Sequence, residues 1–168
     1  EHAQSYHTYM HQLLFDHNAS WNADNIHIPQ GHVDDLEREA GRYENQLKQI
    51  GQPDIQLLGI GENGHIGFNE PGTSFESETR VVDLTDSTIN ANSVHFDHID
   101  DVPKQAVSMG LNSIMRAKRI ILLAFGERKR DAIHQLLNGE TTESLPVSIL
   151  HQHPNVEIIV DDTIFKHL

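Results

Sequence analysis

A glycine-rich segment in the first half of the chain carries the side chains best suited to proton transfer. Asn63, His65 and Glu70 occur in it, among glycines at 59, 61, 64 and 67. An imidazole exchanges protons near neutral pH, and an amide and a carboxylate in a folded-back loop can orient its ring. Glycines let the backbone approach a ligand and present its N–H groups. The segment therefore predicts an acid/base site, with Gly61 and Gly64 as backbone contacts to a substrate.

Residues of the same segment also fit a weaker alternative, a dinucleotide-binding turn. Residues 59–64 match the Gly-x-Gly-x-x-Gly pattern of dinucleotide-binding turns, and Asp83 follows at about the 20-residue distance expected for the ribose contact. A plain strand and turn with a loop histidine would give the pattern too. Spacing alone leaves these alternatives open.

A second candidate position is Lys129. The sequence Gly126-Glu-Arg-Lys129 follows an apolar run and begins a predicted helix. Free N–H groups and the helix dipole attract anions at such a point. The alternative is a solvated charge run over residues 127–131.

The composition excludes several classes of protein. The chain has 168 residues, no cysteine, and a formal net charge of −13, from 12 Lys and Arg against 25 Asp and Glu. The lack of cysteine removes disulfides, thiolate catalysis and cysteine-based metal centres. The acidic balance argues against nucleic-acid or anionic-membrane partners, and the apolar runs are far shorter than the ~20 residues of a membrane span. We expect a cytoplasmic domain, as a monomer or homo-oligomer, with no signal peptide.

One further motif resembles a metal pair, namely His151-Gln-His153. A catalytic or structural metal ordinarily takes three or more protein ligands, and no third ligand is evident nearby. The pattern favours an exposed loop, so the sequence predicts no metal site at these two histidines.

The elements that must position these residues alternate between strands and helices. Apolar runs and alternation predict strands at 55–60, 79–84, 103–109, 119–125 and 156–160, and helical spacing predicts helices at 6–14, 33–49, 86–92, 113–117 and 126–138. Such alternation indicates an α/β fold: a single domain over 1–168 with a Rossmann-like, mostly parallel sheet flanked by helices. Its opening is unusual, because a helix stands where such folds begin with a strand and a Gly-rich turn.

Residues 58–72 resemble the signature of the glucosamine-6-phosphate deaminase family. The resemblance continues through 91–93, 102–106 and 120–126 and covers essentially the whole chain. The 6-phosphogluconolactonase branch of the same superfamily shares the Gly-x-Gly-His element. After the histidine, however, Phe68-Asn-Glu-Pro71 is the deaminase form.

The resemblance implies conversion of glucosamine 6-phosphate and water to fructose 6-phosphate and ammonia, in amino-sugar catabolism, without a cofactor. The partner would be a small-molecule sugar phosphate. His65 would assist opening of the sugar ring, Asn63 and Glu70 would hold and tune it, and Lys129 would bind the phosphate. Alternatives are a lactonase-type hydrolase and a non-catalytic sugar-phosphate-binding domain.

Two departures from the family pattern bear on activity. Val94 stands where the family has a phosphate-binding arginine, although His95 follows. The sequence also contains no Asp-Glu-Tyr, the element whose aspartate moves a proton between C2 and C1. We therefore expect the C-terminal portion of the family fold, without its first strands and inactive alone unless Asp83 or Asp86 substitutes. Val82 and Asp83 also argue against an allosteric effector site.

Overall fold

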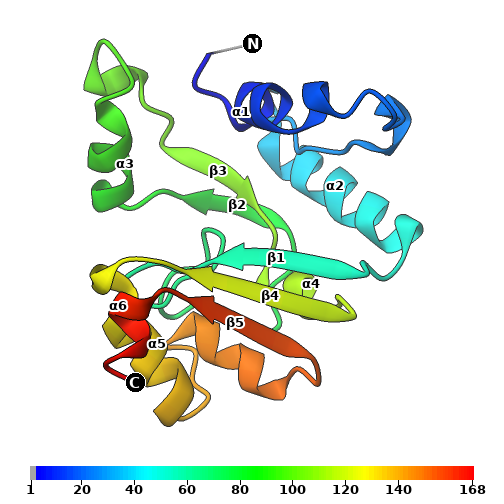
Figure 1. The fold of residues 1–168 in the computed structure, drawn as a ribbon. Coiled ribbons are helices and arrows are strands. Elements are labelled where there is room, and N and C mark those ends of the chain that lie inside the picture. The colour runs from blue at the N-terminus through cyan, green and yellow to red at the C-terminus, as the bar shows by residue number, and fades with distance from the viewer. Residues whose placement is uncertain (1–2) are drawn as a thin grey trace.

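A three-stranded parallel sheet forms the centre of the computed structural model, which describes residues 3–168 (Figure 1). Its strands are β1 (Ile55–Gly59), β4 (Arg119–Ala124) and β5 (Val156–Val160), in the order β1-β4-β5. Their register places Leu58 beside Leu122 and Leu122 beside Ile158. The predicted α/β fold is confirmed, and each of these strands lies where the sequence pattern placed it.

One face of this sheet carries the core. Leu58, Ile120 and Leu122 are buried, and they pack with apolar side chains from the helices that follow. These helices are α4 (Leu111–Met115), α5 (Arg130–Asn138), α6 (Asp162–Phe165) and the 3-10 helix η5 (Pro146–Gln152). On the opposite face Leu57 and Ile159 are exposed, although parallel sheets are ordinarily covered on both faces.

The remaining strands pair separately from the parallel sheet. β2 (Arg80–Asp83) and β3 (Gln105–Ser108) run antiparallel, with Arg80 opposite Ser108. Between them lie α3 (Asp86–Ser93) and the 3-10 turn η3 (Ile99–Asp101). Thr85 caps α3 by accepting a hydrogen bond from the Thr88 backbone N–H.

Helix α2 (Leu36–Ile50) connects the antiparallel pair to the rest of the domain through Glu44. This buried carboxylate accepts hydrogen bonds from Thr79, Ser113 and Arg116. Burial alone would raise the pKa of Glu44, but these hydrogen bonds outweigh it and lower the pKa to about 2. The carboxylate therefore stays ionised and holds α2, β2 and α4 together.

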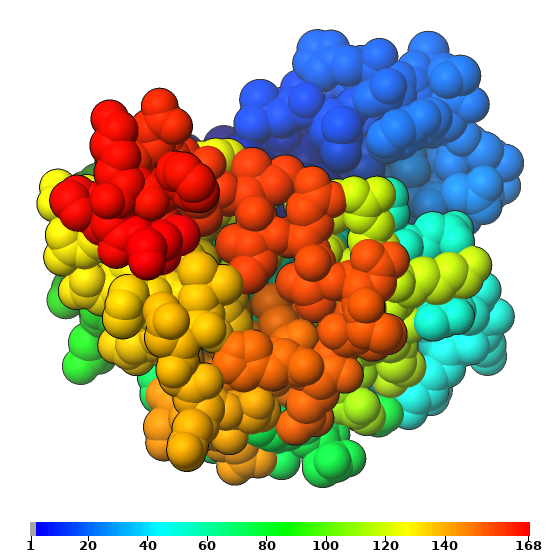
Figure 2. Space-filling model, turned by 60° about the horizontal axis from the view of Figure 1, so that its bottom comes forward, coloured from blue at the N-terminus to red at the C-terminus, as the bar shows by residue number. Residues whose placement is uncertain are grey.

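Helix α1 (Tyr6–Leu13) forms where the helical spacing predicts it, but its apolar side chains are not buried. Tyr6, Tyr9 and Leu13 are exposed and the helix has no buried residue. It packs chiefly on the 3-10 turn that follows it, η1 (Phe15–His17), and the N-terminal segment projects from the body of the molecule (Figure 2). The spacing of apolar residues predicts a helix, but it does not specify the surface against which that helix packs. No helix within residues 3–168 is long and apolar enough to cross a membrane.

Candidate active site

The glycine-rich segment leaves β1 at its carboxyl end and folds tightly around one imidazole. The Gly61 N–H donates to the His65 carbonyl at 2.8 Å, and the Gly64 N–H donates to the Gly61 carbonyl at 3.0 Å. A Cβ at position 61 would lie 2.2 Å from ring atoms of His65, and one at position 64 would lie 2.3 Å from a Leu145 methyl. Gly64 also has a φ of 82°, which disfavours other residues. Both glycines are needed for this folding, and their predicted contact with a substrate remains a prediction.

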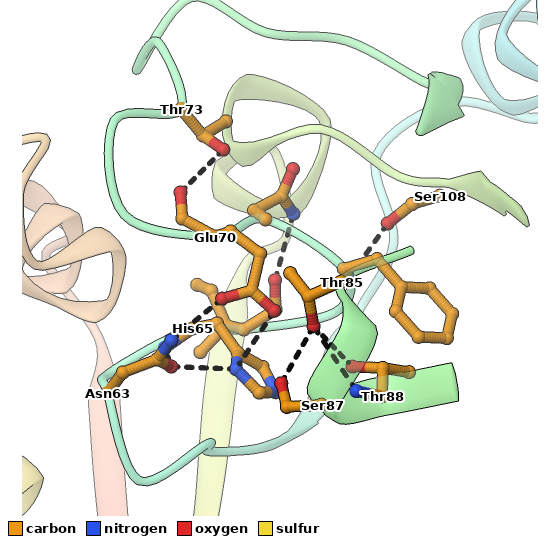
Figure 3. Close-up of polar contacts among 11 residues, drawn as sticks. Asn63, His65, Glu70, Thr73, Thr85, Ser87, Thr88 and Ser108 are labelled. Carbon is orange, nitrogen blue, oxygen red and sulfur yellow. Dashed lines mark hydrogen bonds and ion pairs between the residues drawn. The ribbon is translucent and has the colours of Figure 1, made fainter. Parts of the chain in front are cut away.

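The three side chains predicted to act together do lie together (Figure 3). His65 Nδ1 is 2.8 Å from Asn63 Oδ1, and Asn63 Nδ2 donates to a Glu70 carboxylate oxygen at 2.7 Å. The other Glu70 oxygen lies 3.5 Å from the same Nδ1. The amide, the imidazole and the carboxylate thus close a ring of contacts.

This network assigns the proton on the His65 ring. The side-chain amide of Asn63 donates a hydrogen bond to Glu70, so its oxygen faces His65. The two groups near Nδ1, the Asn63 amide oxygen and a Glu70 carboxylate oxygen, are therefore both hydrogen-bond acceptors. Nδ1 therefore carries the hydrogen, and the lone pair of the neutral ring is on Nε2. The side chain is about one-third exposed, so Nε2 can exchange a proton with a bound molecule.

The segment 142–148, after α5, holds the loop at both ends. The Val147 N–H donates to the Gly64 carbonyl at 2.9 Å, and the Gly72 N–H donates to the Glu143 carbonyl at 2.8 Å. The Glu143 carboxylate accepts from the Phe75 N–H at 2.9 Å. Sequence reasoning missed these supports, since no local spacing relates residues about 70 positions apart.

Three consecutive basic residues beside the loop, at positions 128–130, differ in their ion pairs. Arg128 forms an ion pair with Glu62 at 2.7 Å, which links the loop to the 3-10 turn η4 (Glu127–Lys129). Arg130 contacts Glu127 and Asp131. In the part of the chain that the structure describes, Lys129 has no carboxylate partner, and it stands directly before α5. Of the three adjacent cations, Lys129 is the one without an ion pair among residues 3–168.

Comparisons with known proteins agree with this arrangement. A family model described as glucosamine-6-phosphate isomerases/6-phosphogluconolactonase matches residues 1–159. The chain belongs to this family. It is 96% identical over its whole length to a glucosamine-6-phosphate deaminase of Staphylococcus haemolyticus, and 62% identical over 161 residues to one of Staphylococcus aureus.

The family members extend beyond the matched region. The chain spans 69% of the S. haemolyticus protein and 64% of the S. aureus protein. A solved structure of a monomeric glucosamine-6-phosphate deaminase is 46% identical, with a TM-score of 0.92 over 99% of this chain and 68% of that one. A 6-phosphogluconolactonase from Thermotoga maritima shares only the fold, at 17% identity and a TM-score of 0.71. The predicted resemblance to the deaminase branch is confirmed.

Other predicted positions lie on β2 and α3. Val94 caps the C-terminus of α3 and is 79% exposed, with His95 exposed beside it. Asp83 accepts a hydrogen bond from Gln105, and Asp86 begins α3. Because Asp83 lies on the antiparallel pair and not on a neighbouring parallel strand, the dinucleotide alternative does not fit this fold.

The His151 and His153 rings face backbone groups. His151 Nε2 contacts the Leu136 carbonyl, and His153 Nε2 lies 2.7 Å from the Ala117 carbonyl. Across residues 3–168 no group of three or more His, Asp or Glu side chains is arranged to hold a metal ion. The two histidines join η5 to neighbouring elements.

Proposed function

We propose that the protein acts on glucosamine 6-phosphate as a deaminase, converting it with water to fructose 6-phosphate and ammonia. The observation that carries this proposal is the contact ring of Asn63, His65 and Glu70, which leaves Nε2 of the imidazole as its proton-accepting atom. Relatives named as deaminases, 96% and 62% identical to this chain, support the same reaction. We infer a cytoplasmic, monomeric enzyme of amino-sugar catabolism, in keeping with the monomeric structural neighbour.

In the first step His65 transfers a proton between the anomeric hydroxyl and the ring oxygen while the C1–O5 bond breaks. Nε2 takes up and returns this proton, because Nδ1 already carries a hydrogen that Asn63 accepts. The imidazolium formed in between is stabilised by the Glu70 carboxylate at 3.5 Å. The later proton transfer between C2 and C1 needs a second base, which the family resemblance attributes to an Asp-Glu-Tyr element.

Lys129 is proposed to bind the phosphate group of the sugar. Its ammonium forms no ion pair with the residues that the structure describes, and it precedes the first turn of α5, where backbone N–H groups favour an anion. A charge-assisted hydrogen bond to phosphate contributes on the order of 1.5–3 kcal/mol.

Two alternative functions, a lactonase and a non-catalytic binding protein, differ in the observations that support them. A lactonase would use His65 to activate water at a lactone, but the lactonase neighbours support only the fold. A non-catalytic sugar-phosphate-binding protein is favoured by one observation, the exposed Val94 in place of the family's arginine.

Ammonia release from glucosamine 6-phosphate by the purified protein, with and without the family's upstream region, tests the proposal, with calorimetry of sugar-phosphate binding beside it. Turnover that is lost in His65→Gln but kept in His134→Gln, a histidine on the exposed side of α5, supports the deaminase. Hydrolysis of 6-phosphogluconolactone would support the lactonase. Binding without ammonia release, also after the family's upstream region is added, would support the binding protein.

A further inference from the structure

A short turn separates the two charged members of the candidate site. Residues 66–69 reverse the chain, with Ile66 and Asn69 forming an isolated antiparallel bridge. The Asn69 N–H donates to the Ile66 carbonyl at 3.1 Å. His65 immediately precedes this turn and Glu70 immediately follows it, so the closure of the turn sets the separation of imidazole and carboxylate.

The side chain of Asn69 closes the turn and attaches it to the antiparallel strands. Asn69 is fully buried, and its Nδ2 donates to the carbonyls of Ile66 and Met109, both at 2.9 Å. Its Oδ1 accepts from Arg80 Nη1 at 2.8 Å. The first bond lies within the turn, the second reaches the residue after β3, and the third reaches the first residue of β2.

Arg80 determines which way the Asn69 amide points. A guanidinium only donates hydrogen bonds, so the amide oxygen must face Arg80 and the amide nitrogen must face the two carbonyls. Burial lowers the pKa of Arg80, and within residues 3–168 no carboxylate forms an ion pair with it. An aspartate at 69 would satisfy Arg80 but would set a carboxylate oxygen against two carbonyl oxygens, which explains the need for an amide.

We propose that Asn69 is a positioning residue that holds Glu70 against the His65–Asn63 pair, with Arg80 fixing the orientation of its amide. The inference deepens the proposed function and rests on it for the catalytic consequence. The geometric consequence is independent of turnover. If Glu70 moves away, Asn63 loses the acceptor that turns its oxygen to His65, and the hydrogen is no longer held on Nδ1.

The turn retains other support when Asn69 is altered. The Phe68 N–H donates to Ser108 Oγ at 3.1 Å, and the Asn69 backbone still reaches Ile66. We therefore expect Asn69→Ala to fold with a displaced Glu70. This expectation separates a positioning role from a role in stability alone.

The test follows the two ring nitrogens of His65 by ¹⁵N NMR, at a pH where the ring is neutral. Their chemical shifts give the fraction of the tautomer with hydrogen on Nδ1, and Glu70→Ala gives the fraction expected without the carboxylate. Asn69→Ala should lower the fraction of the Nδ1–H tautomer, by at least about half of the decrease that Glu70→Ala causes. The double variant should show the same fraction as Glu70→Ala alone. An unchanged tautomer in Asn69→Ala, or full addition of the two effects, would overturn the proposal.

A second variant and a control make the test independent of folding and of turnover. Arg80→Met should shift the tautomer in the same direction by a smaller amount, and it decides the question if Asn69→Ala does not fold; an unchanged tautomer then overturns the proposal. Ser113→Ala removes a buried hydroxyl that donates to Glu44, outside the turn, and should leave the His65 ring signals unchanged.

In an active enzyme Asn69→Ala should lower kcat by roughly 10-fold or more while KM stays within about twofold. Absence of ammonia release from the unaltered protein would contradict the proposed function but not the tautomer result.

Discussion

The two halves of the candidate site are built in contrasting ways. In the acid/base loop, residues 60–72, His65 is oriented by two side chains and the loop is bonded at both ends to residues 142–148. On the anion-binding side Lys129 has no carboxylate partner among the described residues 3–168, and Val94 is 79% exposed. The imidazole is thus placed before any ligand arrives, whereas the cation is left for the ligand to order.

This difference separates chemistry from binding. A preorganised proton-transfer group affects the barrier of the reaction, because it needs no rearrangement in the transition state. A single unpaired lysine contributes chiefly to affinity, and it does so equally for the substrate and the transition state. Substitutions in the two halves should therefore affect different kinetic constants.

The largest effect is expected for the acid/base loop. His65→Gln should lower the rate of ammonia release by roughly 10²- to 10⁴-fold, because general acid/base catalysis is lost. Calorimetry should show sugar-phosphate affinity within about threefold of the unaltered protein, since the phosphate side is intact. A parallel loss of affinity would mean that the two halves are not separable.

A smaller effect, on stability alone, is expected for the buried Glu44 carboxylate, outside both halves. Glu44→Gln should lower the free energy of unfolding at pH 7 by about 1–3 kcal/mol, because three buried donors lose an ionised acceptor. The pKa of Glu44 in the folded protein is about 2, below its usual 4.5. The stabilisation is therefore present above pH 4.5 and is lost as the pH falls toward 2.

Urea unfolding at pH 7 and pH 3 checks this prediction for Glu44. The difference in free energy of unfolding between the unaltered protein and Glu44→Gln should be smaller at pH 3 than at pH 7. Glu37→Gln, an exposed glutamate on the same helix, should change little at either pH. A difference that stays constant with pH would show that the ionised carboxylate is not the cause.

On the anion-binding side, Lys129→Met should weaken sugar-phosphate binding roughly 10- to 100-fold, from the lost charge-assisted hydrogen bond. The adjacent Arg128→Met should change affinity by no more than about threefold, because an exposed ion pair contributes little. Titration calorimetry of both variants measures the contrast. Equal losses would indicate a diffuse charge effect in place of a specific contact.

The smallest effect is expected from restoring a cation. Val94→Arg should strengthen sugar-phosphate binding by roughly 3- to 10-fold, because it returns the guanidinium found in the family pattern. The same calorimetry with fructose, which lacks the phosphate, is the control and should show no gain. Unchanged affinity for the phosphorylated sugar would place Val94 outside the anion-binding side.

The sequence predicted the elements better than their packing. All five strands were anticipated, since the alternation of apolar residues acts locally. The exposure of Tyr6, Tyr9 and Leu13 on α1 was not anticipated, nor was the separate antiparallel pairing of β2 and β3. Both depend on which surfaces meet in three dimensions, and local periodicity contains no such information.

The site shows the same division. His65, Asn63 and Glu70 could be grouped from the sequence because one short loop holds all three. The contacts of Asn69 with Met109 and Arg80, and of Glu143 with the loop, join distant parts of the chain. The family resemblance marked Asn69 as part of a signature without indicating its bonds, and nothing in the sequence distinguished Glu143 from other surface glutamates.

The position of β4 between β1 and β5 has a consequence for hydrogen–deuterium exchange. Both edges of this strand are paired, so its amide hydrogens are released only when the sheet separates. The loop after β4 is also attached to the loop after β5, because the Gly126 N–H donates to the Asp161 carboxylate at 2.7 Å. Lys129 thus lies three residues from a hydrogen bond that joins the loops after β4 and β5. Its side chain can move to meet a phosphate while this bond limits the movement of the nearby backbone.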